Sequence, residues 1–440
     1  MSLAASSLAR PDHTGSLPEI FRSITVPSEV RFWGKIGAFT GPGYLVAVGY
    51  IDPGNWATDL AGGARYGYTL LSIIAVANLL AIFLQTLSLR LGIATGHDLA
   101  QLCRERFNRP TALCLWVACE LAIIACDLAE VVGSAIALQL LFGLPLIIGL
   151  CATALDVCVI LWLQNRGFRY IEALVMALLC VIGGCFAFEL VLARPDMRAI
   201  AAALLPSRQI VTDPAMLYIA IGIIGATVMP HNLYLHSALA QTRQYDRVER
   251  GKREAIRFAT IDSTTALMAA LFINAAILIV AVSFQRAGYT EVAEIQDAYR
   301  LLTPVLGGGL ASLLFGIALL ASGQMSAVTG TLAGQVVMEG FLRWHVSPVV
   351  RRLATRALAI VPALGVTVMC GESGTGQLLV LSQVVLSLQL SFAVVPLVMF
   401  TSDRSLMGAF TNPSWVRVGG GFVAAVIVLL NGWLVWQVLG

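Results

Sequence analysis

Long apolar stretches recur along this chain of 440 residues and are separated by short polar segments. Leu70–Ser88, Ala266–Phe284 and Phe422–Leu439 are typical. Each is close to the roughly 20 helical residues that cross a hydrocarbon core of about 30 Å. Clusters of Pro, Gly and charged residues divide the chain into eleven predicted spans. These cover approximately residues 36–66, 68–93, 112–140, 143–164, 170–193, 214–240, 258–285, 302–338, 353–370, 376–400 and 418–439. The pattern predicts an all-α polytopic membrane protein.

Composition agrees with this interpretation, because 58% of the residues are hydrophobic and only 12% are charged. A soluble domain has about twice that charged fraction. Residues 1–33 are polar and lack the apolar run of a secretory signal, so we expect a mobile tail and no cleaved leader. Residues 34–440 are expected to form one transmembrane domain within the lipid bilayer.

Positive charge predicts how the chain is oriented in the membrane. If the N-terminus is cytoplasmic, 22 of the 28 Lys and Arg residues fall on the cytoplasmic side and 6 on the other. The basic loop QTRQYDRVERGKREAIR is then a topology signal and gives no reason to expect nucleic acid as a partner. With eleven spans, the C-terminus is extracellular or periplasmic. The absent export signal favours the inner membrane of a bacterium, which is its plasma membrane.

Two spans are interrupted by helix-breaking residues at matching positions. The first runs GAFTGPGYLVAVGYIDPGN and the sixth runs YIAIGIIGATVMPHN. We therefore expect spans 1–5 (36–193) and 6–10 (214–400) to be inverted copies, a 5+5 repeat with broken helices 1 and 6, and span 11 (418–439) to be an addition. Paired interruptions of this kind are the best sequence indication of a transporter's binding site.

The interruptions supply a mixed set of candidate metal ligands. Proline and glycine free backbone carbonyls, which survive in a membrane only inside protein or beside a wet cavity. The carbonyls of Gly49 and Ala226 precede the breaks, Asp52 adds a carboxylate, Asn55 an amide oxygen and Met229 a thioether. Sulfur is a poor ligand for Mg²⁺ and Ca²⁺ and a tolerable one for Mn²⁺ and Fe²⁺. The set therefore favours a divalent transition metal ion.

Each of these features also has a structural interpretation. Proline-kinked membrane helices are common, a lone DPG can be a loop, and a methionine in a span more often packs than binds metal. The occurrence of both interruptions at corresponding positions is what favours a binding site.

Span three carries three acids in an apolar helix, namely Glu120, Asp127 and Glu130. At about 100° per residue they lie within about 80° of one another and share a face. Intramembrane acids of this kind are typical of proton relays. The expected counter-charges are three arginines at the start of span nine, Arg351, Arg352 and Arg356.

Two histidines in span six, His231 and His236, are about 140° apart around the helix and do not form one chelating face. We expect His231, two residues after Met229, to tune protonation of Asp52. For His236, a place on the proton route and a structural role both stay open. Three further polar residues in the spans, Asp156, Asp262 and Asn274, are expected to be paired structurally, and nothing in the sequence explains Asp156 further.

The motifs DPGNWATD, GGARYGYTLL and MPHNLYLHS closely resemble those of the Nramp family of divalent metal transporters, and the resemblance runs from about Phe39 to the C-terminus. It implies a LeuT-type inverted-repeat fold and proton-coupled uptake of Mn²⁺ or Fe²⁺. It also implies that the metal binds Asp52, Asn55, Met229 and the carbonyl of Ala226, with that of Gly49 in other states. A glutamine in LVLSQVV, Gln383, is implied to join when the site closes. Family members that carry Mg²⁺ or Al³⁺ lack the methionine, which this chain keeps.

By the same resemblance, acids at Asp127 and Glu130 lead protons towards the cytosol beside an arginine of span nine. We therefore expect import by alternating access, with metal and protons as substrates, no cofactor and no obligate protein partner. A sodium- or proton-coupled amino-acid symporter of the same fold is the alternative. A membrane metalloenzyme is disfavoured because HExxH and any His pair at i, i+4 are absent.

Overall fold

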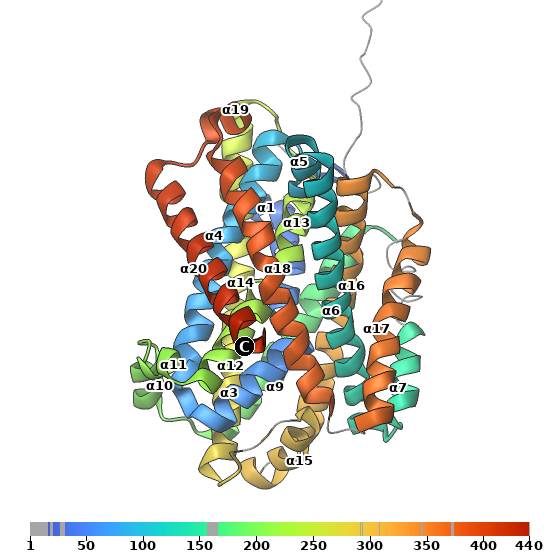
Figure 1. Cartoon of the computed structure of the whole chain (residues 1–440), viewed down its shortest axis with the longest axis vertical. Helices are drawn as coiled ribbons and strands as arrows, with labels where there is room; N and C mark the ends of the chain where they lie inside the picture. Colours follow the sequence, from blue (N-terminus) through green and yellow to red (C-terminus); the bar gives the residue numbers. More distant parts are fainter. Residues whose placement is uncertain are drawn as a thin grey trace, which may run out of the picture.

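The computed structural model describes residues 16–17, 21–26, 31–155, 166–290, 292, 294–307, 309–344, 346–370 and 374–439. Within these ranges the chain forms an elongated bundle of helices (Figure 1). The only strands among the described residues are the short β1 (Ile24–Thr25) and β2 (Arg243–Gln244), which pair in parallel. The predicted all-α architecture is confirmed.

The first half of the chain contains the first broken span and four further membrane segments. Its elements are α1 (Phe32–Phe39), α2 (Pro42–Val48), η1 (Gly49–Ile51), α3 (Pro53–Tyr66), η2 (Gly67–Leu70), α4 (Leu71–Thr95), α5 (Leu99–Arg106), α6 (Arg109–Phe142), α7 (Leu146–Ala152), η3 (Thr153–Leu155) and α9 (Phe168–Ala193). The predicted fourth span is described only as far as Leu155. Asp156 lies outside the described residues.

The second half contains the second broken span. Its elements are α10 (Met197–Ala203), α11 (Gln209–Thr212), α12 (Pro214–Thr227), α13 (Pro230–Leu239), α14 (Glu249–Arg286), α15 (Ile295–Leu306), α16 (Ala311–Leu342), α17 (Pro348–Cys370), α18 (Thr375–Ser402), α19 (Arg404–Met407), η5 (Gly408–Phe410) and α20 (Ser414–Leu439).

Nine helical stretches in the described part of the chain are long and apolar enough to cross a membrane. One of them, Pro53–Thr95, joins the second half of predicted span one to span two. The shorter apolar stretches Pro42–Ile51 and Leu146–Leu155 belong to predicted spans one and four. The eleven predicted spans therefore correspond to these nine stretches and two short pieces.

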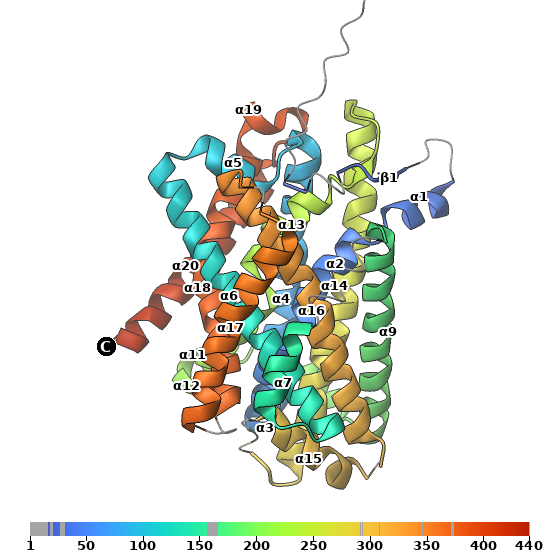
Figure 2. The same ribbon diagram turned by 90° about the vertical axis from the view of Figure 1, so that its right-hand side faces the viewer.

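The start of the first span differs from the prediction. Residues 36–39 belong to α1, which lies to one side of the bundle (Figure 2), and the membrane segment begins at Pro42. The chain turns at Gly41, whose φ of 140° is unfavourable for other residues. The backbone N–H groups of Gly41 and Gly43 then donate to the carboxylate of Asp262 on α14, at 3.2 and 2.7 Å. Asp262 thus has the structural pairing that the sequence analysis expected.

The start of the eighth span also differs. Residues 302–306 belong to α15, which ends at Gly307 in a left-handed conformation with φ of 70°. A glycine at this position is the usual way to end a helix. The span itself, α16, begins at Ala311.

Burial separates the interior spans from the peripheral ones. In the broken helix pair Pro214–Leu239, 78% of the apolar window is buried, against 22% for Ser414–Trp433 in α20. The broken spans therefore lie inside the protein, where freed backbone groups can be satisfied. In Figure 1, α20 lies at the edge of the bundle.

The described part of the N-terminal tail packs against the bundle. Ser16 and Leu17 are buried, and the Ser16 hydroxyl donates to Asp98 at 2.5 Å. The backbone N–H groups of Arg22 and Ile24 donate to carbonyls in the linker between α13 and α14. For these residues the expectation of a mobile tail was wrong. Backbone pairing with the linker supplies contacts that a pattern of polar residues does not reveal.

Candidate metal-binding site

The two helix interruptions have the same local cause. Asp52 has an extended backbone conformation between η1 and α3, and Met229 has one between α12 and α13. Each is followed by proline at the first helical position, Pro53 or Pro230. Proline disfavours a helical conformation in the residue before it and fits the first turn of the next helix. The sequence therefore dictates both breaks locally.

The interruptions meet in space through Asn55. Its amide nitrogen donates to Asp52 Oδ1 at 2.6 Å and to the backbone oxygens of Ala226 at 3.1 Å and Gly49 at 3.4 Å. Three oxygen acceptors thus surround one donor nitrogen. This is the arrangement that a cation would occupy, because the same oxygens can serve as metal ligands. Rotation of the amide about its last side-chain bond would turn the oxygen of Asn55 towards the same point.

Met229 and Gln383 complete the surroundings of these oxygens. A Cβ atom on Gly49 would lie 3.2 Å from the sulfur of Met229, and a Cβ on Gly54 would overlap the amide of Gln383. Gln383 lies on α18, so a third helix contributes to these surroundings. The structure therefore brings together all six residues that the sequence analysis named for the metal site.

Several oxygen atoms around the interruptions have no hydrogen-bond partner within the described part of the chain. They are Asp52 Oδ2, Gln383 Oε1, Thr227 Oγ1 and Asn232 Oδ1. All four side chains are at most 1% exposed. Buried polar atoms are normally satisfied, so a group of unsatisfied oxygens indicates a place for a ligand. Sequence reasoning missed Thr227 and Asn232, although both are polar residues next to the MPH motif.

The described residues contain no group of three or more His, Cys, Asp and Glu side chains suited to a metal. The candidate set instead has one carboxylate, amide and backbone oxygens, and one sulfur. Such a mixed set binds a metal ion more weakly than a site of several charged or imidazole ligands, which suits an ion that must be released.

The acids of span three form ion pairs with the arginines of span nine. Arg351 contacts Glu120 at 2.9 Å. Arg352 contacts Asp127 at 2.9 Å and Glu130 at 3.3 Å. Arg356 contacts the same two acids at 3.0 and 3.8 Å. The stripe on α6 therefore divides into a Glu120–Arg351 pair and a cluster of two acids with two arginines.

The acid cluster lies close to the candidate metal site. Met229 packs against Ala122 and Cys126 of α6, and the Cys126 sulfhydryl contacts Glu130 at 3.7 Å. At Gly133, the next turn of α6, a Cβ atom would overlap the ring of Pro53. One helix thus connects the site with the paired acids.

The two histidines have different surroundings. His236 contacts the oxygen of Gln85 at 2.9 Å, and the Gln85 amide donates to the Tyr50 hydroxyl at 2.8 Å. Asn274, for which pairing was expected, donates to the backbone oxygen of Tyr50 at 2.7 Å. His231 is buried, and its Nδ1 has no partner among the described residues. Sequence reasoning missed Tyr50 and Gln85, of which Gln85 is a polar residue in an apolar span.

Comparison with known proteins places these features in a family. The family model described as natural resistance-associated macrophage protein-like, Nramp, matches residues 43–437. A relative from Nostoc sp., the divalent metal cation transporter MntH, is 61% identical over 430 residues, which cover 98% of this chain and 97% of the relative.

Solved structures give the same result at the level of the fold. The Eremococcus coleocola manganese transporter superposes with a TM-score of 0.88 at 41% identity, covering 94% of this chain and 89% of that one. Mhp1, a nucleobase-cation-symport-1 family transporter, superposes with a TM-score of 0.59 at 15% identity, covering 90% and 92%. At that identity the second likeness concerns the fold alone, which is the predicted LeuT-type architecture.

Proposed function

This chain belongs to the Nramp family, and from that premise we propose that it imports Mn²⁺ and Fe²⁺ together with protons by alternating access. At the coarser level it is a multi-pass membrane transporter of divalent metal cations and not an enzyme. The metal is a substrate that passes through the protein.

The observation that carries the proposal is the nitrogen of Asn55 among three oxygens. Asp52, Gly49 and Ala226 direct an acidic oxygen and two carbonyl oxygens at one point between the two broken helices. When a divalent ion takes that point, the Asn55 amide rotates and contributes its oxygen. The unsatisfied second oxygen of Asp52 and the oxygen of Gln383 are further donors within reach of the same region.

Met229 supports a transition metal as the substrate. A thioether adds little to the binding of Mg²⁺ or Ca²⁺, which prefer oxygen, and more to that of Mn²⁺ or Fe²⁺. Its sulfur lies beside Gly49, so it is near enough to the carbonyl set to complete it.

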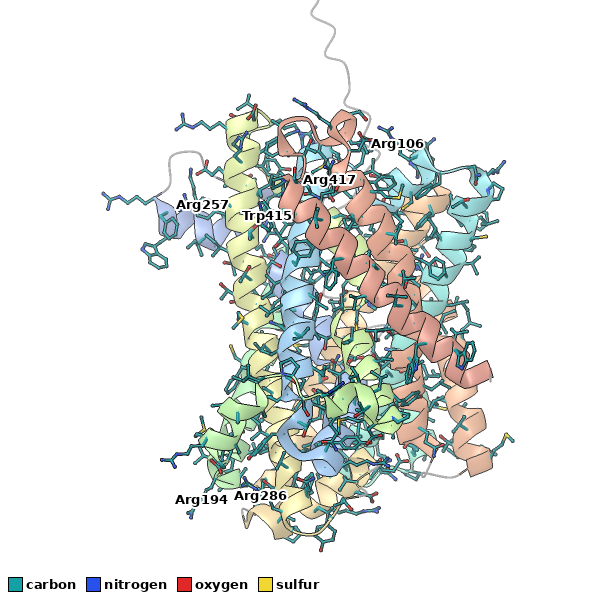
Figure 3. All side chains as sticks on the ribbon, turned by 60° about the vertical axis from the view of Figure 1, so that its left-hand side comes forward. Arg106, Arg194, Arg257, Arg286, Trp415 and Arg417 are labelled. Carbon is teal, nitrogen blue, oxygen red and sulfur yellow. The ribbon has the colours of Figure 1, made fainter. Side chains whose placement is uncertain are left out.

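The proposed transport cycle moves the broken helices. Metal enters from the outer side, and Gln383 on α18 closes over Gly54 and the ion. Movement of α2 and α13 then opens the site to the cytosol. The charge asymmetry assigns the cytoplasmic end: Arg106, Arg257 and Arg417 lie at one end of the molecule, and Arg194 and Arg286 at the other (Figure 3). The first three belong to the arginine-rich side that we assign to the cytoplasm.

Protons are proposed to follow α6 from the metal site to the cytosol. Metal binding needs the ionised form of Asp52, so a proton held there must leave. Glu130 and Asp127 receive it, and Glu120, which lies nearer the cytoplasmic end of α6, passes it on. Arg352 and Arg356 offset the charge of the cluster. We place His231, beside Met229, at the start of this route, whereas His236 is held by Gln85.

The deciding experiment reconstitutes the full chain in proteoliposomes with a pH-sensitive dye inside. Mn²⁺ uptake is expected to acidify the lumen and to accelerate when the outside is more acidic. Uptake without any acidification would contradict proton coupling. Competition by amino acids instead of Mn²⁺ or Fe²⁺ would support the organic-substrate alternative.

The ligand assignment is tested in the same vesicles. Asp52→Ala removes the one formal charge in the metal site and is expected to abolish uptake. Robust Mn²⁺ uptake by this variant would defeat the assignment.

A further inference from the structure

A small pocket lined by arginine and lysine lies at the predicted cytoplasmic end, separate from the metal site. Phe21 and Arg22 of the N-terminal segment, the end of α4, the linker between α13 and α14, and the start of α14 form its walls. Its free volume for the centres of water-sized spheres is about 40 Å³. One water needs about 10–15 Å³ on this measure, so the pocket has room for a few waters or one compact oxyanion.

The charge of this basic pocket is one-sided. Four of its lining residues are cationic, Arg22, Arg243, Arg247 and Lys252, and none is acidic. The charge of Arg243 is matched by Glu172, which it contacts at 2.7 Å. Within the described part of the chain, Arg22, Arg247 and Lys252 have no acidic partner within 4.0 Å. Three unmatched cations therefore face a space of anion size.

A basic cytoplasmic loop alone does not account for this convergence. Arg250, Arg253 and Arg257 belong to the basic stretch and lie outside the pocket lining, as expected for residues that only set topology. Arg247 and Lys252 also belong to this stretch, but they line the pocket together with Arg22, which comes from the N-terminal segment more than 200 residues earlier in the chain. Lys252 is fixed by donating to the carbonyl oxygen of Ala94, at the end of α4, at 2.7 Å.

The N-terminal segment completes the pocket by backbone pairing. The N–H groups of Arg22, Ile24 and Val26 donate to carbonyls of the linker at 3.1, 3.2 and 3.1 Å. Arg22 has a φ of 52°, which is unfavourable for arginine, and its guanidinium lies 5.2 Å from the ring centroid of Phe21. Pairing of the N-terminal segment with the linker therefore brings Arg22 to the pocket that Arg247 and Lys252 already line. Electrostatic repulsion among the three cations opposes this pairing.

We propose that the basic pocket binds a phosphate group and that binding holds residues 21–26 against the linker. Phosphate offers several strong acceptor oxygens, which suit arginine and lysine donors. It can come from free phosphate in the cytosol or from the headgroup of an anionic phospholipid, since basic pockets at this membrane face bind such headgroups. Because the pocket is complete only with the segment in place, anion binding and docking strengthen each other.

Docking of residues 21–26 on the linker also involves a residue that contacts the start of the first broken span. Arg243 lies at the end of the paired strand β2 and donates to the carbonyl oxygens of Ala38 at 3.2 Å and Thr40 at 2.8 Å. These carbonyls end α1, directly before α2 begins. An anion in the basic pocket therefore stabilises the position of the half-helix that must move for inward release.

The test is hydrogen exchange of the full chain in nanodiscs of phosphatidylcholine, with millimolar inorganic phosphate or with sodium chloride at equal ionic strength. Phosphate is expected to slow exchange at Arg22, Ile24 and Val26 severalfold. Arg247→Gln removes a cation that has no acidic partner in the described part of the chain, and it is expected to raise the phosphate concentration needed for protection by about tenfold. The matched control Arg257→Gln, on an exposed arginine outside the pocket, is expected to respond like the wild type (Figure 3).

Discs that contain phosphatidylglycerol distinguish the two sources. If the headgroup fills the pocket, the segment is protected without added phosphate, and further phosphate has no effect. If free phosphate is the ligand, both disc types respond to it alike. The proposal would be overturned if neither anion protected residues 21–26 from exchange. It would also be overturned if Arg247→Gln and Arg257→Gln lost phosphate-dependent protection equally. The measurement involves no manganese, so its outcome is independent of the proposed transport function.

Discussion

Arg352→Gln is the perturbation that most directly separates structural from functional roles in the acid cluster. Arg352 lies 2.9 Å from Asp127 and 3.3 Å from Glu130, while Arg356 lies 3.0 and 3.8 Å from the same acids. Removing one guanidinium leaves two buried acids with a single arginine. The charge balance of the cluster then shifts by one unit towards negative.

The magnitude follows from these distances. Two unit charges about 3 Å apart interact by roughly 5 kcal/mol at an effective dielectric constant of about 20. Much of this offsets the desolvation of the charged groups. Breaking one partner out of a buried pair costs about 3–5 kcal/mol, because the remaining charge stays buried. Arg352→Gln should therefore lower the thermal midpoint of the purified protein by several degrees.

A second substitution restores the balance. Glu130→Gln in the Arg352→Gln background leaves one acid and one arginine, and it is expected to recover at least half of the lost stability. Arg351→Gln combined with Glu130→Gln is the matched control, since Arg351 pairs with Glu120 and not with the cluster. Its effects are expected to be additive.

The functional measurement uses the same variants in proteoliposomes with dye-monitored acidification. The rescued double variant should be stable and take up Mn²⁺, yet show little proton flux, because a titratable group of the route is gone. If Glu130→Gln fails to restore stability to Arg352→Gln, the electrostatic reasoning is wrong. If the rescued variant still acidifies the lumen at the normal rate, the assigned route is wrong.

Three further predictions concern the metal site and the cytoplasmic end. Gly54→Ala should displace the Gln383 amide and weaken Mn²⁺ uptake at low concentration by about tenfold, and Gln383→Ala should have the same effect. Gly184→Ala, whose Cβ meets nothing within 4 Å, should be neutral. Additive losses in the Gly54→Ala, Gln383→Ala double variant would contradict this reasoning. Met229→Ala should retain part of the Mn²⁺ uptake but lose discrimination against Ca²⁺ and Mg²⁺, and competition assays that show unchanged discrimination would remove the sulfur argument. Burial raises the pKa of the Asp98 carboxyl to about 6, so the folded state binds this proton more tightly than the unfolded chain, and the stability it contributes is lost as pH rises through about 6. Asp98→Asn should flatten the dependence of the thermal midpoint on pH between about pH 4 and 7. If the midpoint of the variant changes with pH as steeply as that of the wild type, the assignment to Asp98 is wrong.

Much of the fold was predictable because the signals are local. Apolar runs long enough to cross a bilayer give the spans, and proline after Asp52 and after Met229 gives both helix interruptions. Predicted boundaries were wrong where a single glycine with a positive φ separates two helices, at Gly41 before α2 and at Gly307 after α15, inside stretches predicted as continuous apolar spans. A hydropathy window averages over a single glycine, whereas one glycine is enough to change the direction of the backbone.

In the candidate site, too, local features were predictable and long-range contacts were not. Sequence placed Glu120, Asp127 and Glu130 on one face of a helix, since helical periodicity alone decides that. It did not decide which arginine meets which acid, because Arg351 and Glu120 are 231 residues apart. It also missed Thr227, because only the packed structure shows that its hydroxyl has no hydrogen-bond partner among the described residues.

The sequence by itself thus determined the membrane architecture, the two broken helices and the chemical types available at them. Periodicity, helix breaking and charge asymmetry act over a few neighbouring residues. Only the tertiary structure decided that Asn55 spans 171 residues of sequence to reach Ala226, and that the N-terminal segment lies on the α13–α14 linker. These contacts depend on the register between packed helices and on side-chain direction, which no local pattern specifies.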